Sequence, residues 1–158
     1  DDSFDRLKHL QLRMEKGAEA GFATYQLNEV KLDKLPMKLM SNYTHEVLQG
    51  IDYAEVVEKR RTNYKMLHEA LGAMNALALP STNSFECPMV YPFIPKKCDI
   101  DLRKMLQEQR IYIATYWPNL AKLNYDTLEE CLAKKIIALP IDQRYNKEDM
   151  KRIIEISK

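Results

Sequence analysis

Glycine is scarce in this chain of 158 residues. The four glycines stand far apart, at Gly17, Gly21, Gly50 and Gly72. A phosphate-binding loop needs several glycines within a few residues, because its backbone amides must approach the phosphate closely. The sequence therefore excludes P-loop and dinucleotide-binding fingerprints.

Cysteine is equally rare. Cys87, Cys98 and Cys131 are odd in number, and no two of them form a Cys-x-x-Cys pair. Neither a disulfide framework nor a zinc site is predicted from three cysteines spaced in this way. A chain that needs neither disulfides nor zinc for its fold is suited to a reducing compartment. We therefore expect a cytoplasmic protein.

Positive and negative charges are nearly balanced. Lys and Arg number 24 against 23 Asp and Glu, which gives a net charge of +1. Without a basic stripe the chain offers little to a phosphate backbone, so nucleic acid is not an expected partner. The apolar runs are only a few residues long, and no membrane span is predicted. The sequence starts at Asp1 without an initiator Met, which we interpret as a cloning or a cleavage boundary.

Residues typical of catalytic or metal sites do not form known patterns here. His9, His45 and His68 fall on three different predicted helices, and none has a second histidine four residues away. No Gly-x-Ser-x-Gly motif is present either. We therefore expect structural histidines, no metal and no catalytic residue within this chain.

Helical patterns dominate the first seventy residues. Apolar residues at helical spacing predict helices over 3–17 and 36–50, joined by a connector over 21–33 with at most a short helical piece. The longest pattern spans 52–72, where Asp52 and Glu55 resemble a capping box and apolar residues recur every three or four positions. This segment is expected to form one long helix.

Short apolar runs bounded by Pro, Asn and Ser follow. They predict strands at 74–79, 87–94, 111–116 and 136–139, and helices that begin near Asp99, Asp126 and Asn146. The prolines of the second strand indicate an edge position. We predict an α+β fold, with a small, mostly antiparallel sheet covered by helices and a helical segment before it. The expected domains are a helical segment over 1–50 and an α+β small domain over 51–158.

The end of the third predicted strand displays polar and aromatic side chains. Tyr116, Trp117 and Asn119 follow an apolar strand pattern at a turn, where a rigid scaffold commonly holds binding residues. The alternative is that the two rings close one end of the core.

A second polar turn follows the last predicted strand. Arg144 in this turn is a candidate for binding a carboxylate or phosphate with two parallel hydrogen bonds. An ion pair with Asp142, or a bond from Asp142 to the backbone, is the favoured alternative.

Several motifs resemble a known family in their order and spacing. The C-terminal region of pyridoxal-phosphate-dependent sugar aminotransferases of the DegT/DnrJ/StrS type is similar in the following segments: Asp33–Met37, Met40–Ser41, Ile51–Tyr53, Arg60–Tyr64 with Leu67 and Leu71, Pro88–Pro92, Leu102–Pro118, Leu139–Tyr145 and Met150–Ile156. The similarity runs from Leu32 to the end of the chain.

The resemblance implies a C-terminal small domain that helps close the active site and line the substrate pocket of an enzyme that aminates a keto-sugar nucleotide. Tyr116, Trp117 and Asn119 match the place where related enzymes present substrate-lining residues. The implied partners are the large domain of the same protein and, in the parent enzyme, a second copy in a homodimer. A related dehydratase that shares the fold is equally consistent with these motifs. The resemblance does not identify the substrate sugar, because this sequence has aromatic residues where related enzymes often have a His.

The cofactor-binding motifs of the family are not found in these 158 residues. The family's Schiff-base lysine follows a serine by three positions, and no Ser-x-x-Lys occurs here. Pyridoxal phosphate is therefore expected in the parent enzyme and not on this chain alone, which should be inactive by itself. The alternative function is that of a stand-alone, non-catalytic binding or interaction domain.

A severed small domain should also leave an apolar face where the large domain packed. The candidates lie on the N-terminal helices: Phe4, Leu7, Leu10, Met14 and Phe22. We expect these side chains to be exposed.

Overall fold

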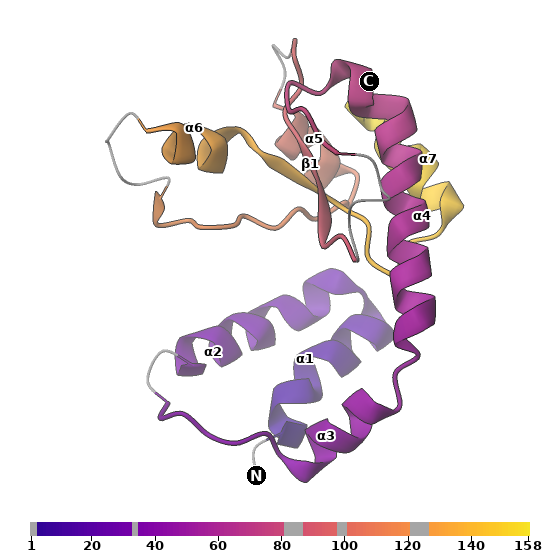
Figure 1. Cartoon of the computed structure of the whole chain (residues 1–158). Coiled ribbons are helices and arrows are strands. Elements are labelled where there is room, and N and C mark those ends of the chain that lie inside the picture. The colour runs from indigo at the N-terminus through magenta and orange to yellow at the C-terminus, as the bar shows by residue number, and fades with distance from the viewer. Residues whose placement is uncertain (1–2, 33–34, 81–86, 98–100, 121–126) are drawn as a thin grey trace. The chain divides into compact units, whose positions relative to one another are not determined.

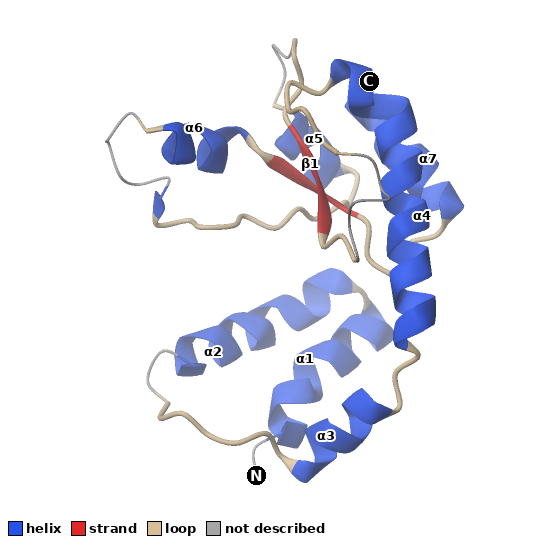
Figure 2. Cartoon of the chain, viewed as in Figure 1, coloured by secondary structure: helices blue, strands red, loops and turns tan. Residues whose placement is uncertain are grey.

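The computed structural model describes residues 3–32, 35–80, 87–97, 101–120 and 127–158 (Figures 1 and 2). The chain divides into two compact units, Asp1–Ile51 and Asp52–Lys158. Helices prevail, and a two-stranded antiparallel sheet lies in the second unit. The predicted α+β class is confirmed.

The first unit is helical. It contains α1 (Ser3–Lys16), a 3-10 turn η1 (Ala18–Gly21), α2 (Phe22–Leu32) and α3 (Asn42–Gln49). Gly17 stands between α1 and η1 with φ 95°, a positive value that glycine adopts readily because it has no Cβ atom. At Gly21 a Cβ atom would lie 2.4 Å from the carbonyl oxygen of His9, so only glycine permits this approach of η1 to α1.

Two predictions for this unit are wrong. The expected connector over 21–33 is mostly the helix α2, and the helix expected from Pro36 begins only at Asn42. Ser41 has extended backbone, and its hydroxyl accepts a hydrogen bond from the Thr44 amide at 3.1 Å. This N-cap fixes the start of α3, because it satisfies an amide that the first helical turn leaves without a partner.

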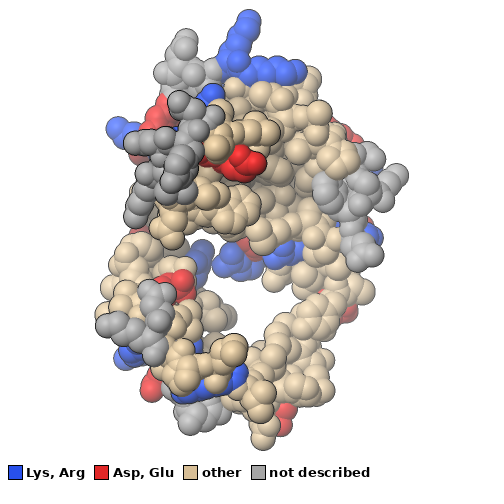
Figure 3. All heavy atoms as spheres, turned by 60° about the vertical axis from the view of Figure 1, so that its left-hand side comes forward, with Lys and Arg blue, Asp and Glu red and all other residues tan. Residues whose placement is uncertain are grey.

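The first unit buries none of its described large apolar side chains. Met14 is 88% exposed, Phe4 67% and Phe22 57%, while Leu10 is also exposed and Leu7 is half-buried. On the face that Figure 3 shows, residues other than Lys, Arg, Asp and Glu cover much of this unit. Four of the five side chains expected to be exposed are therefore exposed.

The second unit contains the sheet. Its elements are α4 (Tyr53–Leu71), a 3-10 turn η2 (Gly72–Met74), β1 (Val90–Phe93), α5 (Leu102–Glu108), α6 (Leu128–Lys135), β2 (Ile137–Pro140) and α7 (Lys147–Ser157). β1 pairs with β2 in antiparallel register, with Val90 opposite Pro140 and Phe93 opposite Ile137. Figure 1 shows α4 beside α7 and the two strands on one side of this helix pair.

Side chains from α4, α5, α7 and both strands form one core in the second unit. Its fully buried members include Leu67 and Leu71 of α4, Phe93 of β1, Leu139 of β2 and Ile153 of α7. Tyr64 and Tyr91 meet edge to face, with ring centroids 5.2 Å apart, and both are buried. Burial raises the pKa of both phenols, because it disfavours the charged form.

Two of the four predicted strands are not strands in the described residues. The segment 74–79 makes a single bridge, between Asn75 and Pro95, and 111–116 is an irregular segment. The expected helix starts Asp99 and Asp126 lie outside the described residues. Asp101 caps α5, and Thr127 caps α6.

No helix in the described ranges combines the length and the apolar character that crossing a bilayer requires.

Candidate functional site

The segment after α5 is held at its start by the core and by one arginine. The Ile111 amide donates to the Leu106 carbonyl at 2.8 Å, and the Ile111 side chain is buried. Arg103 of α5 donates from Nη1 to Thr115 Oγ1 and from Nη2 to the Ile136 carbonyl, each at 3.1 Å. This guanidinium thus ties the segment to the connection between α6 and β2.

The aromatic pair follows directly. The ring centroids of Tyr116 and Trp117 are 5.8 Å apart, and Trp117 is 63% exposed. Trp117 has φ 52°, which is unusual for a bulky residue and costs on the order of 1 kcal/mol or more. The Leu120 amide donates to the Trp117 carbonyl at 3.0 Å and closes the turn. An exposed ring on a strained backbone does not close the core, whereas the half-buried Tyr116 lies partly beneath the surface.

Asn119 lies in the same turn and is exposed. The structure therefore brings Tyr116, Trp117 and Asn119 together on one short turn. An indole face and a carboxamide can contact the apolar face and the hydroxyl groups of a sugar, respectively. We define this turn, residues 116–119, as the aromatic turn.

Arg144 is engaged elsewhere. Its Nε and Nη2 donate to Asp142 Oδ1 and Oδ2 at 2.7 and 2.9 Å, and its amide donates to Asp142 Oδ1 at 3.1 Å. Partial burial acts to raise the pKa of Asp142, but the hydrogen bonds and charge of Arg144, with the charge of Arg60, outweigh it and lower the pKa. The same hydrogen bonds raise the pKa of Arg144. This geometry supports the structural alternative for Arg144.

Arg144 and the aromatic turn do not share a site in the described part of the chain. No hydrogen bond, ion pair or ring contact joins Arg144 to Tyr116, Trp117 or Asn119 among those residues. Figure 1 shows the turn between β2 and α7 beside α4, whereas the segment after α5 runs away from that helix. The candidate site is therefore reduced to the aromatic turn.

Sequence reasoning missed the role of Asn63 in a polar network on α4. The buried Asn63 donates from Nδ2 to the carbonyls of Ile141, Asp142 and Tyr145 at 3.2 to 3.3 Å. Arg60 donates to the Gln143 side chain and to two carbonyls of the chain before β1. The available signal was Asn63 itself, a polar residue on the helix face that carries Leu67.

Every described Lys is exposed to solvent. Within the same ranges, no group of three or more His, Cys, Asp or Glu side chains is placed to hold a metal ion. At the aromatic turn the exposed side chains of Trp117 and Asn119 are available for contact with a ligand.

Comparison of this chain with family models, curated proteins and solved structures found no match. The family resemblance stays a prediction, and it enters below as part of a proposal.

Proposed function

We propose that this chain is the C-terminal small-domain region of a cytoplasmic pyridoxal-phosphate-dependent enzyme that transfers an amino group to a keto-sugar nucleotide. In this proposal the cofactor and its lysine belong to a large domain of the same protein, which forms a homodimer. The present residues help to close the active site and line the substrate pocket. The order of the sequence motifs is the basis of the family assignment.

The exposed apolar face of the first unit is the observation that carries the proposal. Its helices α1 and α2 present Phe4, Met14 and Phe22 to solvent. Large apolar side chains that are exposed in this number are commonly covered by another protein surface, because the burial of each one contributes about 1.5–3 kcal/mol. A large domain of the same protein would supply that cover.

The aromatic turn supports the substrate-lining role. Trp117 is held in a left-handed conformation with its ring outward, and strained residues of this kind are concentrated at ligand-binding sites. In the proposed enzyme the indole stacks on the sugar and Asn119 hydrogen-bonds one of its hydroxyls.

The test is the substitution Trp117→Ala in the protein encoded by the full reading frame. We expect the KM for the sugar nucleotide to rise about tenfold, the factor that corresponds to roughly 1.4 kcal/mol of lost binding. The kcat and the absorbance of the bound cofactor should be unchanged, since the ring contacts substrate and not cofactor. Steady-state kinetics and an absorbance spectrum measure these quantities.

Tyr53→Ala is the matched control, because Tyr53 is an exposed aromatic at the start of α4, away from the turn. It should leave the KM unchanged. An unchanged KM for Trp117→Ala, with a lowered melting temperature, would mean that the ring only supports the fold.

A further inference from the structure

The sheet leaves one edge of β2 without a neighbouring strand in the described residues. The hydrogen bonds of β1 show which backbone groups lie at that edge. The Pro92 carbonyl accepts from the Asn75 side chain, and the Ile94 amide donates to it, so both groups face away from β2. Because this direction alternates along a strand, Tyr91 and Phe93 are the residues of β1 that bond to β2.

The register then places the backbone of Ala138 at the open edge. Leu139 and Ile137 lie opposite the two residues of β1 that bond to β2. Ala138 stands between them and therefore directs its amide and its carbonyl outward. It is 3% exposed, and neither group has a hydrogen-bond partner in the part of the chain that the structure describes. Nearly all buried backbone groups in proteins are paired, so this edge is suited to receive a strand.

The segment 111–115, which we call the strap, has the side-chain pattern of a strand for this edge. Ile111 and Ile113 pack on the core, whereas Tyr112 and Ala114 are exposed. Figure 1 shows the strap running away from α4 and β2 running toward it, so the two are antiparallel. β2 bonds to β1 through its residues on the core face, so an antiparallel neighbour at the open edge bonds through residues on the opposite face. In the strap these residues are Tyr112 and Ala114.

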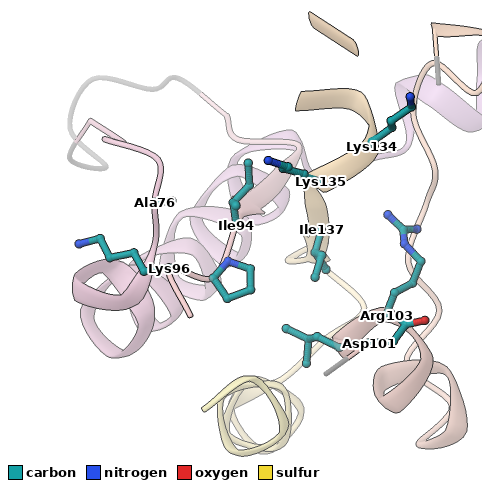
Figure 4. Close-up of a pocket in the computed structure, with 10 residues that line it drawn as sticks. Ala76, Ile94, Lys96, Asp101, Arg103, Lys134, Lys135 and Ile137 are labelled. Atoms are coloured by element: carbon teal, nitrogen blue, oxygen red, sulfur yellow. The ribbon is translucent and has the colours of Figure 1, made fainter. Parts of the chain in front are cut away.

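Arg103 holds the strap next to the open edge. Its Nη2 donates to the Ile136 carbonyl and its Nη1 to Thr115 Oγ1, each at 3.1 Å. Figure 4 shows Arg103 on one side of the chain around Ile137 and Ile94 on the other side. One guanidinium thus bridges the strap and the edge, and it occupies a carbonyl to which an amide of a neighbouring strand could donate.

We propose that the strap docks on the open edge of β2 as a third, antiparallel strand, with the backbone of Ala114 toward β2 and Arg103 displaced from the Ile136 carbonyl. Docking pairs the buried amide and carbonyl of Ala138. Because the strap leads directly into the aromatic turn, docking also fixes Trp117 beside the sheet. The inference concerns the backbone of this chain and does not depend on the proposed enzyme function.

Hydrogen exchange of the 158-residue chain, followed for each amide by NMR, tests the proposal. The Ala138 amide should exchange at least about 100-fold more slowly than in an unstructured chain, because the docked strap accepts its hydrogen bond. Ala114→Pro removes an N–H that faces β2 and should speed the exchange of the Ala138 amide about tenfold. The Leu139 amide bonds to β1 and is the internal reference for folding, so its exchange should change less than about twofold.

Thr115→Pro is the matched control, because the N–H at this position points away from β2 in the docked strap. It also removes the hydrogen bond from Arg103, so it shows what that side-chain contact contributes by itself. We expect it to change the exchange of the Ala138 amide less than about twofold. An unprotected Ala138 amide in the wild type, an exchange rate that Ala114→Pro leaves unchanged, or an equal or larger effect of Thr115→Pro would each overturn the proposal.

Discussion

Single polar side chains hold the turn between β2 and α7, residues 141–145, against α4. The carboxamide of Asn63 is 4% exposed and shares its two N–H donors among three carbonyl oxygens of residues 141–145. Buried carbonyls without a donor are costly, so this residue positions the whole turn.

The substitution Asn63→Ala should therefore destabilise the second unit by about 1–3 kcal/mol, the cost of leaving buried polar groups unsatisfied. Urea unfolding followed by circular dichroism measures the loss. Thr62→Ala is a suitable control, because Thr62 is the exposed neighbour on the same helix and should change the stability far less. Equal effects of the two substitutions would contradict this role for Asn63.

Asp142 makes the stability depend on pH. Its pKa is lowered in the folded protein, so the ionised carboxylate stabilises the fold above the unfolded pKa of about 3.9, and this stabilisation is lost as the pH falls through the folded pKa. Asp142→Asn should lower the stability at pH 7 by up to about 1 kcal/mol, because Arg144 is substantially exposed.

Urea unfolding of the wild type and Asp142→Asn between about pH 7 and pH 2 tests this prediction. The difference between the two proteins should stay constant down to about pH 5 and then shrink. A difference that is the same at both ends of the range would show that the charge of Asp142 contributes nothing.

At the scale of elements, the sequence predicted a helix correctly where an N-cap residue stood directly before a helical apolar pattern. The helix predicted over 52–72 is α4, with Asp52 accepting from the Glu55 amide at 3.0 Å, and the helix after Asn146 is α7, with a complete capping box. In α2 the apolar residues lie on all sides, so no period marks the helix in the sequence. The structure forms a helix there without burying a face.

The segment 111–116 shows why alternating burial of side chains is not enough to predict a strand. Ile111 is buried and Ile113 is half-buried, while Tyr112 and Ala114 between them are exposed, as in a strand. A strand also needs a neighbouring strand for its backbone hydrogen bonds, and in the described residues the sheet consists of β1 and β2 alone. The left-handed backbone of Trp117 in the candidate site was likewise not predictable, because no glycine marks it.

Leucine truncations should distinguish α4 from α2. Leu67→Ala on α4 should cost about 2–5 kcal/mol, because Leu67 is fully buried in the core. Leu27→Ala on α2 makes the same chemical change at a side chain that is 64% exposed, and should cost less than about 0.5 kcal/mol. Thermal or urea unfolding compares them, and similar losses would show that α2 also has a buried face in solution.

At the scale of the whole molecule, the two units differ in what they bury. The second unit has a continuous core of aliphatic and aromatic side chains, whereas the first has none among its described residues. Composition could not reveal this difference, because apolar residues are plentiful in both. In the proposed enzyme, a large domain would cover the exposed apolar side chains of the first unit and would hold the cofactor lysine.

The most direct test of that account is to express the full reading frame that encodes this chain and to locate its cofactor by borohydride reduction and peptide mapping. The account predicts a reducible pyridoxal phosphate chromophore on one lysine that precedes these 158 residues in the protein, while the isolated chain retains no chromophore after desalting. A reading frame that starts close to Asp1, or a protein without the chromophore, or a modified lysine within these residues, would contradict it.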